Sequence, residues 1–123
     1  MIESITYDKN QFKIIFKDIV TSKEIFEANE YIIKHQEFKT SLSQLWIYSD
    51  VKDVQLESEE IRRVAVQDKK ASLLNPDIKV AIVSNELLSF GLSRTYQSYC
   101  RVEDLPWEVF VTYSLDEAQE WLN

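Results

Sequence analysis

Two short stretches decide the fold: Val80-Ala81-Ile82-Val83, and before it Leu45-Trp46-Ile47-Tyr48. Each is a run of four consecutive apolar residues. Runs this short and wholly apolar are typical of strands that are covered on both faces, as in a parallel sheet. The segments that follow each run carry apolar side chains at helical spacing, so we expect these strands to alternate with helices.

Three helices are predicted around these strands. The first opens at a capping box formed by Thr21 and Glu24 and extends to about Phe38. The second starts at Ser58, and Ser84 or Asn85 caps the third. The inward stripes are Ile25, Ala28, Ile32 and Ile33 in the first helix, Ile61, Val64, Ala65 and Ser72 in the second, and Leu88, Leu92, Thr95 and Tyr99 in the third.

The chain opens with a predicted hairpin, because residues 2–7 and 11–17 alternate apolar and polar side chains around a polar break. Residues 107–113 predict a last strand by the same alternation. A second capping box, from Ser114 to Glu117, then opens a terminal helix. In this terminal helix, Leu115, Ala118 and Leu122 are expected to face inward. The order of elements along the chain predicts right-handed crossovers and an α/β fold: a five-stranded, mostly parallel mixed sheet with about four helices.

Composition limits the classes of function. The chain has 123 residues, 45% of them hydrophobic and 28% charged, which is sufficient for one domain over residues 1–123. One glycine excludes a glycine-rich phosphate-binding loop. The net charge of −7 argues against nucleic acid or an anionic membrane as partner.

Cysteine, histidine and hydropathy predict the compartment. Cys100 is the one cysteine, so no intrachain disulfide can form, and a reducing cytoplasm is expected. His35 is the one histidine, which excludes most zinc sites, and we expect it to be a solvated helix residue. No signal peptide and no apolar run of ~20 residues is present, so we expect no membrane insertion.

The sequence offers residues for two kinds of catalytic site. The carboxylates of Asp50, Asp53, Glu57, Glu59 and Glu60 follow the central strand, where open α/β sheets place ligands, and Mg²⁺ prefers such groups. A metal-assisted hydrolase using the first three is one hypothesis, but a solvated, helix-capping loop is the favoured interpretation.

Nucleophilic catalysis has even less support. A Gly-x-Ser-x-Gly motif is impossible with one glycine, and His35 is the one imidazole available as a base. Cys100 fits a half-buried helix cysteine better than a reactive one. The sequence therefore predicts no enzyme, no catalytic residue, no metal site and no cofactor.

Gly91 lies inside the third predicted helix, where it costs about 1 kcal/mol relative to alanine. We expect close approach of the helix to the sheet or to a neighbour to offset that cost. Phe90, Arg94 and Tyr96 lie within two turns. They are either packing residues, with Arg94 paired to Glu86, or part of a binding face on which Arg94 contacts a partner.

Four stretches share a pattern with known proteins: residues 80–84, the Phe-Gly-Leu-Ser-Arg-Thr-Tyr stretch at 90–96, the Val-Phe pair at 109–110, and the Leu-Asp-Glu-Ala-Gln-Glu-Trp-Leu helix at 115–122. Together they resemble the SpoIIAA-like (STAS/SEC14-type) family of small bacterial proteins. The resemblance implies a SpoIIAA-like β/α superhelix with one mixed sheet, and it implies no known reaction.

The better-studied STAS relatives are anti-sigma-factor antagonists or regulatory domains, which are switched by phosphorylation of a serine in an Asp-Ser-Ser-Gly stretch. The corresponding stretch here is Glu57-Ser58-Glu59-Glu60, which has acids around its serine and no glycine. Ser58 therefore fits a helix cap better than a phosphoacceptor. The SEC14-type comparison implies instead a lipid or other apolar ligand.

These observations predict a non-enzymatic, STAS-like regulatory domain that binds a protein partner or a second copy of itself as a homodimer, without the serine phospho-switch. The alternative is a small carrier of a lipid or other apolar ligand. The aromatic content of 12% suggests this alternative. The predicted partner-binding residues are Ser58, Glu59, Arg62, Phe90, Gly91, Arg94 and Tyr96.

Overall fold

Five strands form one mixed sheet whose spatial order follows the chain, β1-β2-β3-β4-β5. The computed structural model describes residues 1–85 and 89–123. The first two strands pair antiparallel and the others parallel, so the predicted α/β fold with an opening hairpin is confirmed. The strands are β1 (Ile2–Asp8), β2 (Gln11–Thr21), β3 (Ser43–Gln55), β4 (Lys79–Val83) and β5 (Glu108–Thr112).

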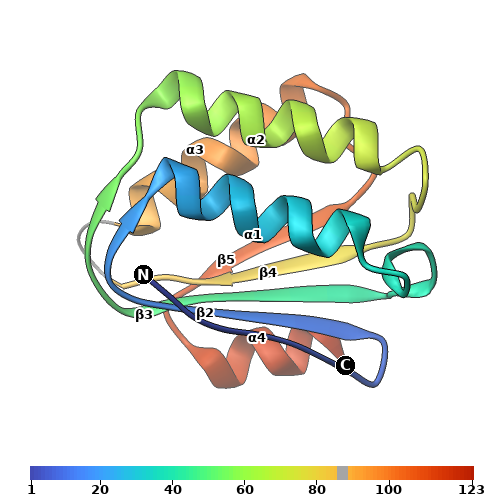
Figure 1. The fold of residues 1–123 in the computed structure, drawn as a ribbon, viewed down its shortest axis with the longest axis horizontal. Helices are drawn as coiled ribbons and strands as arrows, with labels where there is room; N and C mark the ends of the chain where they lie inside the picture. Colours follow the sequence, from blue (N-terminus) through green and yellow to red (C-terminus); the bar gives the residue numbers. More distant parts are fainter. Residues whose placement is uncertain (86–88) are drawn as a thin grey trace.

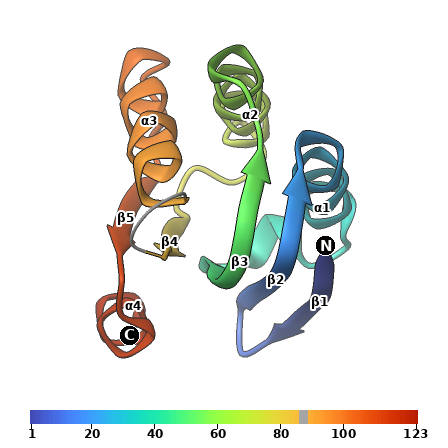
Figure 2. The same cartoon turned by 90° about the vertical axis from the view of Figure 1, so that its left-hand side faces the viewer.

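The helices cover the two faces of the sheet unequally. Figures 1 and 2 show α1 (Ser22–Lys34), α2 (Ser58–Ala71) and α3 (Ser89–Val102) side by side on one face. On the other face α4 (Leu115–Leu122) packs against β3, β4 and β5 (Figure 2). Because successive parallel strands are neighbours and the three crossover helices lie on the same face, the chain winds as a β/α superhelix.

Local sequence explains how the first elements begin and end. Lys9 and Asn10 have φ values of 49° and 66°, the left-handed pair that a two-residue hairpin turn requires. Thr21 caps α1 through the predicted box, since its hydroxyl accepts the Glu24 amide N–H and the Glu24 carboxylate accepts the Thr21 amide N–H.

The core has two parts because the sheet is covered on both faces. The larger part lies between the sheet and α1–α3 and contains Phe12, Phe16 and Trp46, while the smaller lies against Ala118 of α4. Alternate residues of the two apolar runs, 45–48 and 80–83, belong to the two parts, and every residue of both runs is buried. The prediction that both strands are covered on both faces is confirmed.

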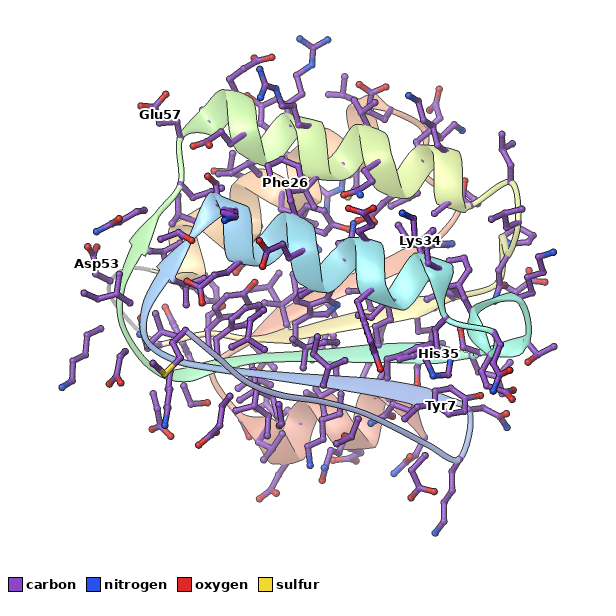
Figure 3. All side chains as sticks on the ribbon, viewed as in Figure 1. Tyr7, Phe26, Lys34, His35, Asp53 and Glu57 are labelled. Carbon is purple, nitrogen blue, oxygen red and sulfur yellow. The ribbon has the colours of Figure 1, made fainter. Side chains whose placement is uncertain are left out.

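The predicted end of the first helix is wrong. α1 ends at Lys34, and Phe38 instead begins a short 3₁₀ helix, Phe38–Thr40. His35 is the C-terminal cap of α1 and is half-buried, with its ring centroid 5.6 Å from that of Tyr7 and 5.1 Å from that of Phe12 (Figure 3). It is therefore part of an aromatic cluster and not a solvated helix residue.

The second helix starts at Ser58 as predicted, but Ser58 is not its cap. Its N-cap is Glu57, whose amide N–H is accepted by the Glu60 carboxylate at 2.9 Å, and Ser58 is the first helical residue. The predicted stripe of α2 is confirmed, because Ile61, Val64, Ala65 and Ser72 are all buried.

The third helix is rotated by about one position from its predicted orientation. Ser93 and Cys100 are buried, and the half-buried Tyr96 lies between them and bonds to Asp68, whereas the predicted residues Leu92, Thr95 and Tyr99 are only half-buried. The predicted inward residue Leu88 and the paired charge Glu86 lie outside the described residues. At the chain's last helix, Ser114 is the N-cap and Ala118 is buried as predicted, but Leu115 is 38% exposed.

Gly91 does not sit at a close approach. A Cβ built on it meets no atom of the described residues within 4 Å beyond its own helix backbone and chain neighbours, and the residue is exposed. The expectation that tight packing offsets its helical cost is therefore wrong.

Candidate ligand-binding site

Two adjoining cavities lie between the sheet and the layer formed by α1, α2 and α3. Their volumes are about 60 Å³ and 50 Å³, and both are partly open. The first extends toward Val54, Leu56 and Leu92, and the second toward Trp46 and Val80. The residues that line both are Ile25, Tyr48, Val64, Ile82 and Tyr96.

The second cavity contains a buried carboxyl group. Asp68 is 3% exposed and projects from the inner face of α2. Its Oδ1 accepts a hydrogen bond from Asn29 Nδ2 at 2.8 Å, and its Oδ2 accepts one from the Tyr96 hydroxyl. In the described ranges, 1–85 and 89–123, no lysine, arginine or histidine forms an ion pair with it.

The electrostatics of this carboxyl follow from its burial. Removal from water raises the pKa of Asp68 to about 6, although the hydrogen bonds from Tyr96 and Asn29 favour the charged form. At neutral pH the group is therefore mostly ionised, inside an apolar layer and without a neighbouring cation. A buried carboxylate of this kind is costly to the fold, which makes it a candidate functional group.

A second polar group faces the same space without a partner. Tyr48 is 9% exposed and lines both cavities, and its hydroxyl makes no hydrogen bond with any residue that the structure describes. Burial raises the pKa of Tyr48, so the hydroxyl is protonated at neutral pH. It therefore has unused capacity to donate or accept a hydrogen bond.

The polar groups that α3 contributes beside Asp68 are the Tyr96 hydroxyl and the Cys100 thiol. The Tyr96 hydroxyl, whose pKa is raised by burial and by Asp68, donates to the carboxylate and does not ionise at neutral pH. Cys100 is buried, and desolvation raises the pKa of its thiol to about 12. This agrees with the expectation of an unreactive helix cysteine.

The acidic cluster predicted from the sequence does not converge on a site. Asp50, Asp53, Glu57 and Glu59 are exposed, and Figure 3 shows Asp53 and Glu57 at the margin of the molecule. In the described part of the chain, no three His, Cys, Asp or Glu side chains are grouped so that they could hold a metal ion.

The predicted partner-binding residues are only partly on one surface. Ser58 Oγ lies 2.7 Å from Tyr99 Oη of α3, and Arg62 Nε lies 4.0 Å from a carboxylate oxygen of Glu103, the residue after α3. Glu59, Gly91 and Arg94 are exposed, and Phe90 is half-buried with its ring centroid 4.4 Å from that of Tyr113. Tyr96 does not belong to this surface, because it points inward to Asp68.

Sequence reasoning missed the polar residues of the cavity, although a signal was present. Asp68 lies three and four positions after Ala65 and Val64, on the stripe predicted to face the core. Asn29 occupies the same kind of position between Ile25 and Ile32. Polar residues on the apolar stripes of two successive helices indicate a buried network.

A larger recess lies elsewhere in the described part of the chain but is a less suitable site. It has a volume of about 470 Å³ and lies between the β1–β2 hairpin and the end of α4. All of its lining residues are polar, among them Thr6, Lys13 and Gln119, and none of them is buried. Such a groove offers solvated side chains and no enclosed group to fix a ligand.

Comparison of the chain with protein-family models, with curated proteins and with solved structures finds no match. The resemblance to the SpoIIAA-like family therefore stays a prediction. Among the residues described, no helix has both the length and the apolar character needed to cross a bilayer.

Proposed function

We propose that this chain is a non-enzymatic carrier of a small, largely apolar ligand, which is held between the sheet and α1–α3. The observation that carries the proposal is the pair of adjoining cavities, which share five lining residues, among them Tyr48, whose hydroxyl has no described hydrogen-bond partner. Ligand sites are typically apolar with a few convergent polar groups, and this space has that composition.

The cavity volume sets the size of the ligand. A water molecule needs about 10–15 Å³ of such space. Cavities of about 60 Å³ and 50 Å³ therefore accept together a ligand on the order of seven to eleven water-sized groups without movement of the helices. A whole lipid is too large, so the apolar-ligand alternative is narrowed to a short-chain compound.

A titration with n-butanol, followed by the ¹³C-methyl NMR signals of Ile25 and Ile82, tests this proposal. Val64 lines both cavities, so Val64→Phe fills them, whereas Val66→Phe makes the same exchange on α2 outside them. Saturable shifts are expected in the wild type and in Val66→Phe, and no saturable shift is expected in Val64→Phe.

The amide spectrum of each variant shows whether it is folded. If Val64→Phe does not fold, Leu92→Phe closes the first cavity from the α3 side and replaces it. Shifts that never saturate in the wild type, that persist in folded Val64→Phe, or whose apparent affinity is unchanged in folded Leu92→Phe would refute the carrier function.

Self-association as a homodimer is the second candidate, in keeping with the regulatory domain predicted from the sequence. The observation that favours it is an exposed apolar group beside Phe90, formed by Tyr113 at 55% exposure and Leu115 at 38%. Arg94 is exposed on the same helix as Phe90.

Sedimentation equilibrium over a wide range of protein concentration tests this second candidate. Arg94→Glu is expected to weaken the dimer, whereas Arg101→Glu, an equal charge change at an exposed position near the end of α3, is expected to leave it intact. A wild-type chain that is monomeric throughout the range contradicts the proposal.

A further inference from the structure

We infer that the ligand of these cavities carries a protonated amine, and that Asp68 binds the ammonium group while the apolar chain occupies the adjoining cavity. This inference rests on the proposed carrier function and adds the chemical class of the ligand. It is drawn from the charge, the hydrogen-bonding capacity and the walls of the second cavity.

Charge is the first argument. Asp68 is a buried carboxyl group, and no cationic side chain pairs with it in residues 1–85 or 89–123. Its two protein partners, the Asn29 amide and the Tyr96 hydroxyl, are neutral donors. A cation is therefore the partner that this cavity lacks, and an anionic ligand would be repelled.

Hydrogen-bonding capacity is the second argument. Each carboxylate oxygen of Asp68 has one described donor, which leaves acceptor capacity on both. The Tyr48 hydroxyl is unpartnered and lines the same cavity. An alkylammonium group offers three N–H donors, so it can bond to the carboxylate and to this hydroxyl together.

The walls distinguish an organic ammonium from a metal ion. The rings of Trp46, Tyr48 and Tyr96 line the second cavity, and aromatic rings attract organic cations. Asn29 directs its amide nitrogen, not its oxygen, at Asp68. A hard metal ion would need several oxygen ligands, whereas this cavity supplies one carboxylate among rings and aliphatic side chains.

Binding of an amine here depends on the ionisation of Asp68 alone. The neighbouring titratable groups are Tyr48 on β3 and Tyr96 and Cys100 on α3, and burial keeps the pKa of each above its ordinary value. Asn29 on α1 and Gln67 on α2 are neutral, and β4 contributes only Val80 and Ile82. Amine affinity is therefore expected to fall as the pH decreases below 6, where Asp68 becomes protonated.

The experiment compares three ligands of equal chain length by methyl NMR at pH 7.5: n-butylammonium, n-butanol and n-butyrate. The wild type is expected to bind n-butylammonium at least tenfold more tightly than n-butanol, and n-butyrate least. In Asp68→Asn, which preserves the shape of the side chain, this preference is expected to vanish while n-butanol still binds. Asp77→Asn, which removes a charge from an exposed aspartate, is the matched control and is expected to retain the preference.

The outcomes separate this inference from the function on which it rests. If n-butanol binds as well as n-butylammonium in the wild type, the ammonium assignment is wrong and the carrier function stands. A preference for amine that survives in Asp68→Asn, or that does not weaken between pH 7.5 and pH 5, also overturns the assignment. If none of the three ligands binds, both proposals fail.

Discussion

The Asp68→Asn substitution gives the most direct test of the electrostatics of the second cavity. The ordinary pKa of an aspartate is 3.8, and burial raises the pKa of Asp68 to about 6 in the folded chain. At about 1.36 kcal/mol for each pKa unit, this difference corresponds to about 3 kcal/mol of folding free energy. Because the folded pKa is raised, the folded state binds the proton more tightly than the unfolded state does.

The sign of the pH dependence follows. The contribution of Asp68 to stability is fully present below pH 3.8 and is lost as the pH rises through about 6. Between pH 4 and pH 7 this one group lowers the free energy of unfolding by roughly 2 to 3 kcal/mol. An asparagine does not titrate, so Asp68→Asn is expected to gain stability relative to the wild type by that amount over the same interval.

Urea denaturation, followed by the fluorescence of the buried Trp46 and Trp107, measures both chains at each pH. The difference between variant and wild type isolates Asp68, because every other carboxyl group is common to both. Asp77→Asn, at an exposed position, is the control and is expected to follow the wild type. A stability difference between Asp68→Asn and the wild type that stays constant from pH 4 to pH 7 would refute the claim that this carboxyl is desolvated.

Three further predictions test local features by urea denaturation. Tyr48→Phe removes the hydroxyl of a buried residue, and this hydroxyl has no described partner, so stability is expected to stay unchanged or to rise by up to about 1 kcal/mol. A loss of more than that would mean that the hydroxyl is bonded. Gly91→Ala places a methyl group in open space on a helix and is expected to stabilise the fold by about 0.5–1 kcal/mol. A loss of stability would contradict the claim that the space around Gly91 is open. Thr21→Ala removes the cap of α1 and is expected to cost about 1 kcal/mol, whereas Thr40→Ala, at an exposed position of the 3₁₀ helix, should cost less. Equal losses would count against the cap.

The predictions that succeeded rest on patterns that neighbouring residues specify. Two four-residue apolar runs predicted strands covered on both faces, and the structure buries all of their residues between the two parts of the core. The Thr21–Glu24 box is also local, since both partners lie within one turn of helix.

The predictions that failed depend on neighbours distant in the sequence. His35 fits a solvated position by its local sequence, but the β1–β2 hairpin brings Tyr7 and Phe12 against its ring. A glycine within a helix lowers its stability, so Gly91 suggested a compensating close contact. Apart from its own helix, none of the described residues lies close to it. The rotation of α3 is of the same kind, because the packing of a helix on the sheet decides which of two adjacent stripes is buried.

For this protein, the sequence alone determined the type and order of the elements, because hydrophobic period and capping residues act over a few positions. It also placed Asp68 and Asn29 on core-facing stripes without indicating that they meet. Only the tertiary structure decided that Asn29 of α1, Asp68 of α2 and Tyr96 of α3 converge beside Tyr48 of β3. That convergence depends on the relative position of three helices on one face of the sheet, which no local pattern encodes.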